Sequence, residues 1–141
     1  MPTPIKFVIK IVGSGSNKRV EIEDEDNSDK KGGDFRGKVL QQRVRWKTVG
    51  NSVDTFDLVF ERYDGDGVVT KEPAWPFFDG KAEPPGGGTD PGSEINEDEG
   101  TVTGAKQFSA RLAEPGVYKY TVKAYKGENS WVLDPAIIID E

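Results

Sequence analysis

Residues 116–125 carry the clearest alternation of apolar and polar side chains in the chain. Alternate side chains of an extended backbone point to opposite faces, so this period of two predicts a strand with one buried face and one solvated face. The turn residues Glu114, Pro115 and Gly116 fix where the strand begins. The side chains that share its expected buried face are Tyr118, Tyr120, Val122 and Ala124.

The same alternation recurs in short segments separated by Gly, Pro, Asn and Ser. It predicts strands at residues 5–12, 19–23, 38–49, 56–61, 107–112 and 131–139, with a short return strand at 68–70 after a turn at 64–67. No helix is predicted, and Trp46 is the expected large filler of the core. The pattern predicts a single all-β domain over residues 1–141, a two-sheet Greek-key β-sandwich of 7–8 strands.

Two segments interrupt the alternation. Residues 24–34 have no apolar side chain and are expected to form a surface loop. Residues 72–103 are rich in Pro, Gly and acidic residues, and we expect one long loop there. A connection of that length inside a compact domain is uncommon and is often functional.

Aromatic residues gather at the start of the long loop, and they are the main candidates for a binding site. Trp75, Phe77 and Phe78, together with nearby Tyr63, could form a surface that binds a sugar, a peptide or a partner protein. The alternative is that the rings fold back and cover the open end of the sandwich, because three rings left in water forgo about 1.5–3 kcal/mol each.

Composition and charge narrow the classes of function. The chain has 141 residues and a formal net charge of −6, and its basic residues are scattered, which argues against binding nucleic acid or an anionic membrane. It has no apolar run of about 20 residues, and Lys6 and Lys10 interrupt the apolar residues at its start, unlike a signal peptide. We expect a cytoplasmic protein, or a mature secreted domain expressed without its leader.

The chain contains neither Cys nor His. It therefore lacks disulfides, thiol chemistry, the usual base of a catalytic triad and the commonest transition-metal ligand. No two acidic residues lie in an apolar strand context that would shift a pKa for acid–base catalysis. We expect a protein that is not an enzyme and needs no cofactor.

Two acidic segments are candidates for calcium sites. Asp64 and Asp66 begin a pattern typical of a calcium loop, but the third ligand and the closing Glu are missing, so a hairpin turn is the favoured interpretation. The second segment could supply carboxylates to a divalent cation, but a run of like charges usually forms a solvated loop. Its residues are Glu94, Glu97, Asp98 and Glu99.

The segment Glu114-Pro115-Gly116-Val117-Tyr118-Lys119-Tyr120, with Trp46 upstream, resembles an immunoglobulin-like sandwich. In that family a Gly-x-Tyr segment forms a tyrosine corner and an earlier Trp packs in the core. Tyr120 matches the position of the second Cys, which implies that an aromatic ring fills the place of the disulfide. The same segment resembles a late strand of a cupredoxin, but the Cys, His and Met copper ligands of that family are absent here, which implies the scaffold alone.

These observations lead us to expect a non-catalytic binding or assembly module that acts through an edge strand or the aromatic loop, with a protein partner or by self-association. The alternative is a small-molecule or carbohydrate-binding domain that uses the aromatic loop. A hydrolase based on carboxylates is the third hypothesis.

Overall fold

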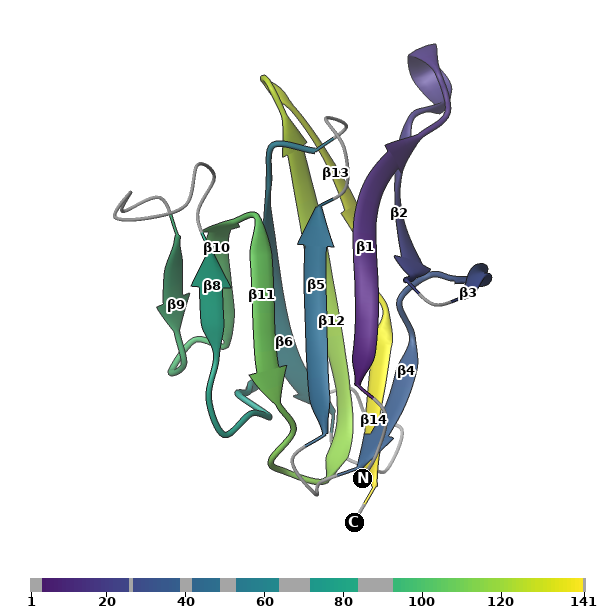
Figure 1. Cartoon of the computed structure of the whole chain (residues 1–141). Helices are drawn as coiled ribbons and strands as arrows, with labels where there is room; N and C mark the ends of the chain where they lie inside the picture. The colour runs from purple at the N-terminus through teal and green to yellow at the C-terminus, as the bar shows by residue number, and fades with distance from the viewer. Residues whose placement is uncertain are drawn as a thin grey trace.

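The computed structural model describes residues 4–25, 27–38, 42–48, 53–63, 72–83 and 93–140. These residues form an all-β fold of two sheets stacked face to face, which confirms the predicted β-sandwich (Figure 1). The predicted number of 7–8 strands was too low, because the described residues form fourteen, several of them only two to five residues long. They contain one turn of 3-10 helix, Gly15–Asn17, and no α-helix. No helix in the described part of the chain is long and apolar enough to cross a membrane.

The first sheet, called the β1 sheet below, has six strands in the order β3-β2-β1-β5-β11-β8. Strands β1 and β5 are parallel, and the other neighbours are antiparallel. Its strands are β1 (Ile5–Val12), β2 (Arg19–Asp24), β3 (Asn27–Lys31), β5 (Arg43–Thr48), β8 (Lys81–Glu83) and β11 (Gln107–Arg111).

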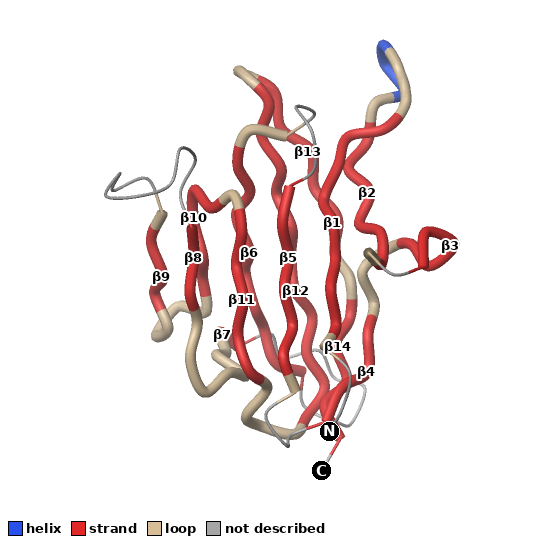
Figure 2. Tube along the Cα trace, in the orientation of Figure 1, coloured by secondary structure: helices blue, strands red, loops and turns tan. Residues whose placement is uncertain are grey.

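The second sheet, called the β12 sheet, has eight strands, and its main order is β4-β14-β12-β6-β10-β9 (Figure 2). Strand β13 also pairs with β12, and β7 pairs with β6. Its strands are β4 (Phe35–Lys38), β6 (Thr55–Tyr63), β7 (Glu72–Pro73), β9 (Glu94–Asn96), β10 (Thr101–Ala105), β12 (Gly116–Lys126), β13 (Asn129–Leu133) and β14 (Ala136–Asp140).

Alternation predicted the central strands and their buried faces correctly. In β12 the inward residues are buried and the residues between them are partly exposed, as expected for a half-buried strand. The predicted strand at 38–49 is shorter in the structure, because Lys38 ends β4 in the other sheet and β5 begins only at Arg43. The predicted turn at 64–67 and return strand at 68–70 lie outside the described residues.

The prediction of one long loop at residues 72–103 was wrong, because β7, β8, β9 and the start of β10 lie in this range. Three of them, β7, β8 and β9, have only two or three residues, which is too short for an apolar alternation to be recognised. In β10 the pairing register shifts between Val102 and Ala105, which breaks the period of two. The loop predicted at residues 24–34 likewise contains β3.

Aromatic rings from both sheets meet in the core. Trp46 on β5 is fully buried, and its ring centroid lies 5.2 Å from that of Tyr120 on β12 and 5.8 Å from that of Phe60 on β6. The Trp46 Nε1–H group donates a hydrogen bond of 3.2 Å to the Tyr120 hydroxyl. The predicted role of Trp46 as the core filler is therefore confirmed.

Tyr125 forms a polar anchor on the outer face of the β12 sheet. Its hydroxyl donates a 2.6 Å hydrogen bond to Asp57 Oδ2, and Asp57 Oδ1 accepts one of 2.9 Å from the Gly104 N–H group at the irregularity in β10. Burial of the phenol, followed by the hydrogen bond and charge of Asp57, raises the pKa of Tyr125 to about 12. The Asp57 carboxylate thus connects three strands.

We expect the phenol of Tyr125 to ionise near pH 12 instead of near 10, its ordinary value. Because the folded pKa is the higher one, the stability from this phenol is fully present below pH 10 and is lost as the pH rises through about 12. The difference in tyrosinate absorbance between the wild type and Tyr125→Phe measures this transition. A difference curve centred near pH 10 would contradict it.

Candidate binding site

The predicted aromatic cluster is divided between the core and the surface. Phe77 is buried, with its ring centroid 4.9 Å from that of Phe60 and 5.2 Å from that of Trp75. Trp75 is half-buried, and its ring also packs on Phe108 at 5.7 Å. Phe78 is 56% exposed. Two of the three rings therefore cover one end of the core, and one is available to a ligand.

Backbone hydrogen bonds hold this segment against the strands. The Ala74 N–H group donates to the Phe60 carbonyl at 3.1 Å, and the Phe78 N–H group donates to the Arg111 carbonyl at 2.9 Å. Phe77 also forms an isolated bridge with Leu112. These contacts fix the direction in which the rings of Trp75 and Phe77 point, so the segment is part of the packed fold.

The other predicted site residues do not join this cluster in the described part of the chain. Tyr63 ends β6, where its backbone pairs with Val117, and the structure does not describe its side chain. Asp64 and Asp66 lie outside the described residues. The described residues contain no group of three or more His, Cys, Asp or Glu side chains that could hold a metal ion.

The second calcium candidate is an ordered, exposed turn between β9 and β10. Glu94, Glu97, Asp98 and Glu99 are all exposed. The Glu99 N–H group donates a 3.2 Å hydrogen bond to Asn96 Oδ1, and the Gly100 N–H group donates one of 3.2 Å to the Glu97 carbonyl. The acidic side chains therefore project into solvent from a hydrogen-bonded turn.

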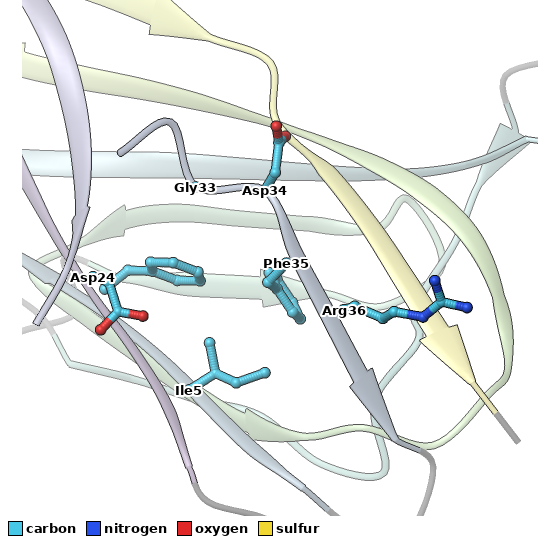
Figure 3. A pocket seen from close by; sticks show the side chains of 7 residues that line it. Ile5, Asp24, Gly33, Asp34, Phe35 and Arg36 are labelled. Carbon is cyan, nitrogen blue, oxygen red and sulfur yellow. The ribbon is translucent and has the colours of Figure 1, made fainter. Parts of the chain in front are cut away.

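A pocket that the sequence did not reveal lies at the side of the sandwich, between the start of β1 and strand β4 (Figure 3). Its volume is about 320 Å³. Four of its lining residues are apolar or lack a side chain, and three are charged. The lining residues are Ile5, Phe7, Asp24, Gly33, Asp34, Phe35 and Arg36.

The pocket exists because the chain crosses from one sheet to the other between β3 and β4. The Gly32 N–H group donates to the Ile22 carbonyl at 2.8 Å on the β1 sheet. The Gly33 carbonyl accepts a 2.5 Å hydrogen bond from the Tyr120 hydroxyl, and Asp34 Oδ1 accepts one of 2.6 Å from the Ala136 N–H group, both on the β12 sheet. The crossing thus bounds the pocket at one end.

Apolar side chains form the floor of the pocket. Phe7 is buried, Ile5 and Phe35 are half-buried, and the rings of Phe7 and Phe35 lie 5.6 Å apart. In Figure 3 the side chains of Asp34 and Arg36 point away from Ile5 and Phe35. The pocket therefore presents an apolar floor with charged groups at its rim, an arrangement typical of binding sites.

The edge beside the pocket is β4, and the opposite edges of the two sheets are β8 and β9. Among the described residues β4 pairs only with β14. At the opposite edge of the β1 sheet, the Ser93 hydroxyl lies 3.5 Å from the Ala82 carbonyl of β8. At the opposite edge of the β12 sheet, β9 carries Glu94 and leads into the acidic turn. Charged side chains discourage pairing at an edge.

No model of a known protein family and no curated protein sequence matches the chain. The geometry of the pocket and of the edge strands is therefore the basis for a functional proposal. The local signal for the pocket was the pair Gly32-Gly33 followed closely by Phe35, since glycine readily adopts the positive φ that both positions have at the crossing.

Proposed function

We propose that this protein is a non-catalytic binding module that receives an extended segment of a partner protein along the edge of β4. One large apolar side chain of that segment enters the neighbouring pocket. The observation that carries the proposal is that an edge strand and a pocket with an apolar floor lie side by side. An added strand gains affinity from main-chain hydrogen bonds and specificity from such a pocket.

The size of the pocket supports a side chain as its occupant. Small-molecule sites span about 300–1,000 Å³, so a cavity of about 320 Å³ lies at the lower limit of that range. Its floor of Ile5, Phe7 and Phe35 suits an apolar group, because the side chains of Asp34 and Arg36 at the rim point away from it. One aromatic or long aliphatic side chain matches this volume and chemistry.

The scaffold is best compared with a metal-free cupredoxin-like sandwich. An immunoglobulin sandwich consists of two antiparallel sheets, whereas β1 pairs in parallel with β5 and β14 with β4 in this chain. The immunoglobulin-like features are local: Tyr118 Oη donates a 3.1 Å hydrogen bond to the Glu114 carbonyl, in the manner of a tyrosine corner, and Tyr120 packs on Trp46.

The chemistry of the chain supports binding in preference to catalysis or copper transport. The sequence has no Cys and no His, which are the ligands that copper prefers. Strand β12 is joined to β13 by a tight turn at Gly127 and Glu128, which leaves no loop after β12 to carry such ligands. The scaffold is therefore proposed to act through its edge and pocket.

The test is a selection of random peptides on the immobilised protein, followed by affinity measurements on the enriched sequences. We expect β-forming peptides with one large apolar residue. Their affinity should fall by about tenfold or more for Ile5→Trp, because loss of one buried apolar group corresponds to at least 1.4 kcal/mol. The added indole fills the pocket from its floor.

Val117→Trp is the matched control, since Val117 is 44% exposed on the outer face of β12 and does not line the pocket. It adds the same ring and should leave the affinity unchanged. Melting curves establish that both variants fold. The proposal would be contradicted if the enriched peptides bound Ile5→Trp as tightly as the wild type. It would also be contradicted if the selection enriched no peptide.

The alternative function is binding of a small apolar molecule in the same pocket. The aromatic floor of Phe7 and Phe35 favours it. Ligand-observed NMR with a library of aromatic fragments distinguishes the two functions. Fragments that bind the wild type but not Ile5→Trp, together with a failed peptide selection, favour the small molecule.

A further inference from the structure

The outer face of the β1 sheet carries basic side chains in two neighbouring rows. Lys6, Arg45 and Lys81 lie in one row across β1, β5 and β8, because Lys6 pairs with Arg45 and Ser109 pairs with both Arg45 and Lys81. In the next row Arg43 on β5 lies directly opposite Arg111 on β11. Adjacent strands are about 4.8 Å apart. Lys6 and Arg45, and Arg43 and Arg111, are therefore close neighbours, whereas β11 separates Lys81 from Arg45.

These five residues, called the basic rows below, have a local excess of positive charge. Two carboxylates lie among them: Glu25, which pairs with Arg45 and Lys47, and Asp79, which pairs with Arg111. Five cations against two carboxylates leave an excess of three positive charges, on a chain whose formal net charge is −6. The net charge of the basic rows is therefore opposite in sign to that of the whole protein.

Within the free chain the cross-strand pair of arginines is only partly neutralised, because among the described residues Asp79 pairs with Arg111 alone. Like charges directly opposite each other on neighbouring strands are destabilising, and Arg43 and Arg111 occupy such positions. Arg43 and Lys81 are exposed, and neither forms an ion pair with another described residue. An external anion would relieve this repulsion.

The ion pairs that this face already forms with Asp79 and Glu25 indicate that a carboxylate is a suitable partner for its cations. Asp79 accepts hydrogen bonds of 3.0 Å from Arg111 Nε and 3.1 Å from the Arg111 N–H group. Glu25 Oε1 lies 3.0 Å from Lys47 Nζ, while Glu25 Oε2 pairs with Arg45. The hydrogen bond from Lys47 lowers the pKa of Glu25. The face thus holds carboxylates between its cations, and guanidinium groups match carboxylate geometry.

We propose that the basic rows form a second interaction surface, which binds an acidic, carboxylate-bearing segment of a partner protein. Arg43, Lys81 and Lys6 are the groups that the incoming carboxylates contact. This surface is the outer face of the β1 sheet, so it is separate from the pocket and does not depend on the proposed function of β4.

The experiment measures binding of a fluorescently labelled oligoglutamate peptide to the full chain at low ionic strength. The wild type should bind, and binding should weaken as salt is added, because salt screens exposed charges. The double variant Arg43→Ser with Lys81→Ser should bind about tenfold more weakly, since each exposed ion pair contributes modestly.

The control is Lys119→Ser with Lys123→Ser, which removes the same charge from the outer face of the β12 sheet. It should change the affinity less than twofold, as expected for distant screened charges. Equal weakening by the two double variants would mean that net charge alone attracts the peptide, and it would overturn the proposal. Absence of binding by the wild type would do the same.

Heparin and vesicles containing phosphatidylserine are measured in parallel. One of these two ligands could bind more tightly than oligoglutamate and lose that binding in the double variant Arg43→Ser with Lys81→Ser. This result would assign the surface to a sulfated polymer or a lipid surface, and it would overturn the carboxylate assignment. Preference for oligoglutamate supports it.

Discussion

Replacing Phe77 with alanine should lower the free energy of unfolding by about 3–5 kcal/mol, because a buried Phe ring leaves both lost contacts and a cavity. Phe77 is 5% exposed and packs on Phe60, Trp75 and Phe108 with ring centroids 4.9, 5.2 and 5.7 Å away. Denaturation by urea, followed by tryptophan fluorescence, measures the change as a shift in midpoint at constant slope.

Phe78→Ala is the control, since the neighbouring ring is 56% exposed. Surface substitutions usually change stability by less than about 0.5 kcal/mol. The contrast between adjacent positions tests whether this segment covers the core. A stable Phe77→Ala variant, or equal losses at both positions, would mean that the rings are a surface patch, as the alternative view of the aromatic cluster holds.

The second large effect is expected at the crossing between β3 and β4, where Gly33→Ala should cost about 2–5 kcal/mol. Gly33 has φ of 79°, a conformation that side chains disfavour. A Cβ atom there would also lie 2.6 Å from the Tyr120 hydroxyl and 2.9 Å from Ile22 Cδ1. The substitution would therefore disturb the bond from the Tyr120 hydroxyl to the Gly33 carbonyl, 2.5 Å in the native chain.

Gly32→Ala separates backbone strain from lack of space. Gly32 has φ of 100°, and a Cβ atom there would meet nothing within 4 Å. Its expected cost is only the strain of a positive φ, about 1–2 kcal/mol. Urea denaturation of both variants gives the comparison. If Gly33→Ala costs no more than Gly32→Ala, the close packing of the crossing against Tyr120 is contradicted.

The crossing connects stability with the proposed function. Burial of its hydroxyl raises the pKa of Tyr120, so this phenol stays neutral and donates to the Gly33 carbonyl. That bond places Asp34 and Phe35 at the pocket. If the backbone at Gly33 could not approach Tyr120 so closely, Asp34 and Phe35 would not bound the pocket at this end. The edge of β4 would then have no neighbouring cavity.

The amino-acid pattern by itself determined the central strands and the core. Alternation is a local property, because each side chain of a strand points opposite to its neighbour whatever the strand pairs with. Phe56, Leu58 and Phe60 on β6 therefore identified their own buried face, as did Trp46 on β5. The short strands β7, β8 and β9 were not predicted, since two or three residues are too few to show a period of two.

Only the tertiary structure decided which distant residues become neighbours. Arg43 and Arg111 face each other because β5 pairs with β11 in one register, and a shift of one residue would remove the contact. Ile5 and Phe35 line one pocket because the chain changes sheets at Gly33. Register and crossing are set by the packing of the whole core. The pair Gly32-Gly33 permits the crossing but does not by itself specify it.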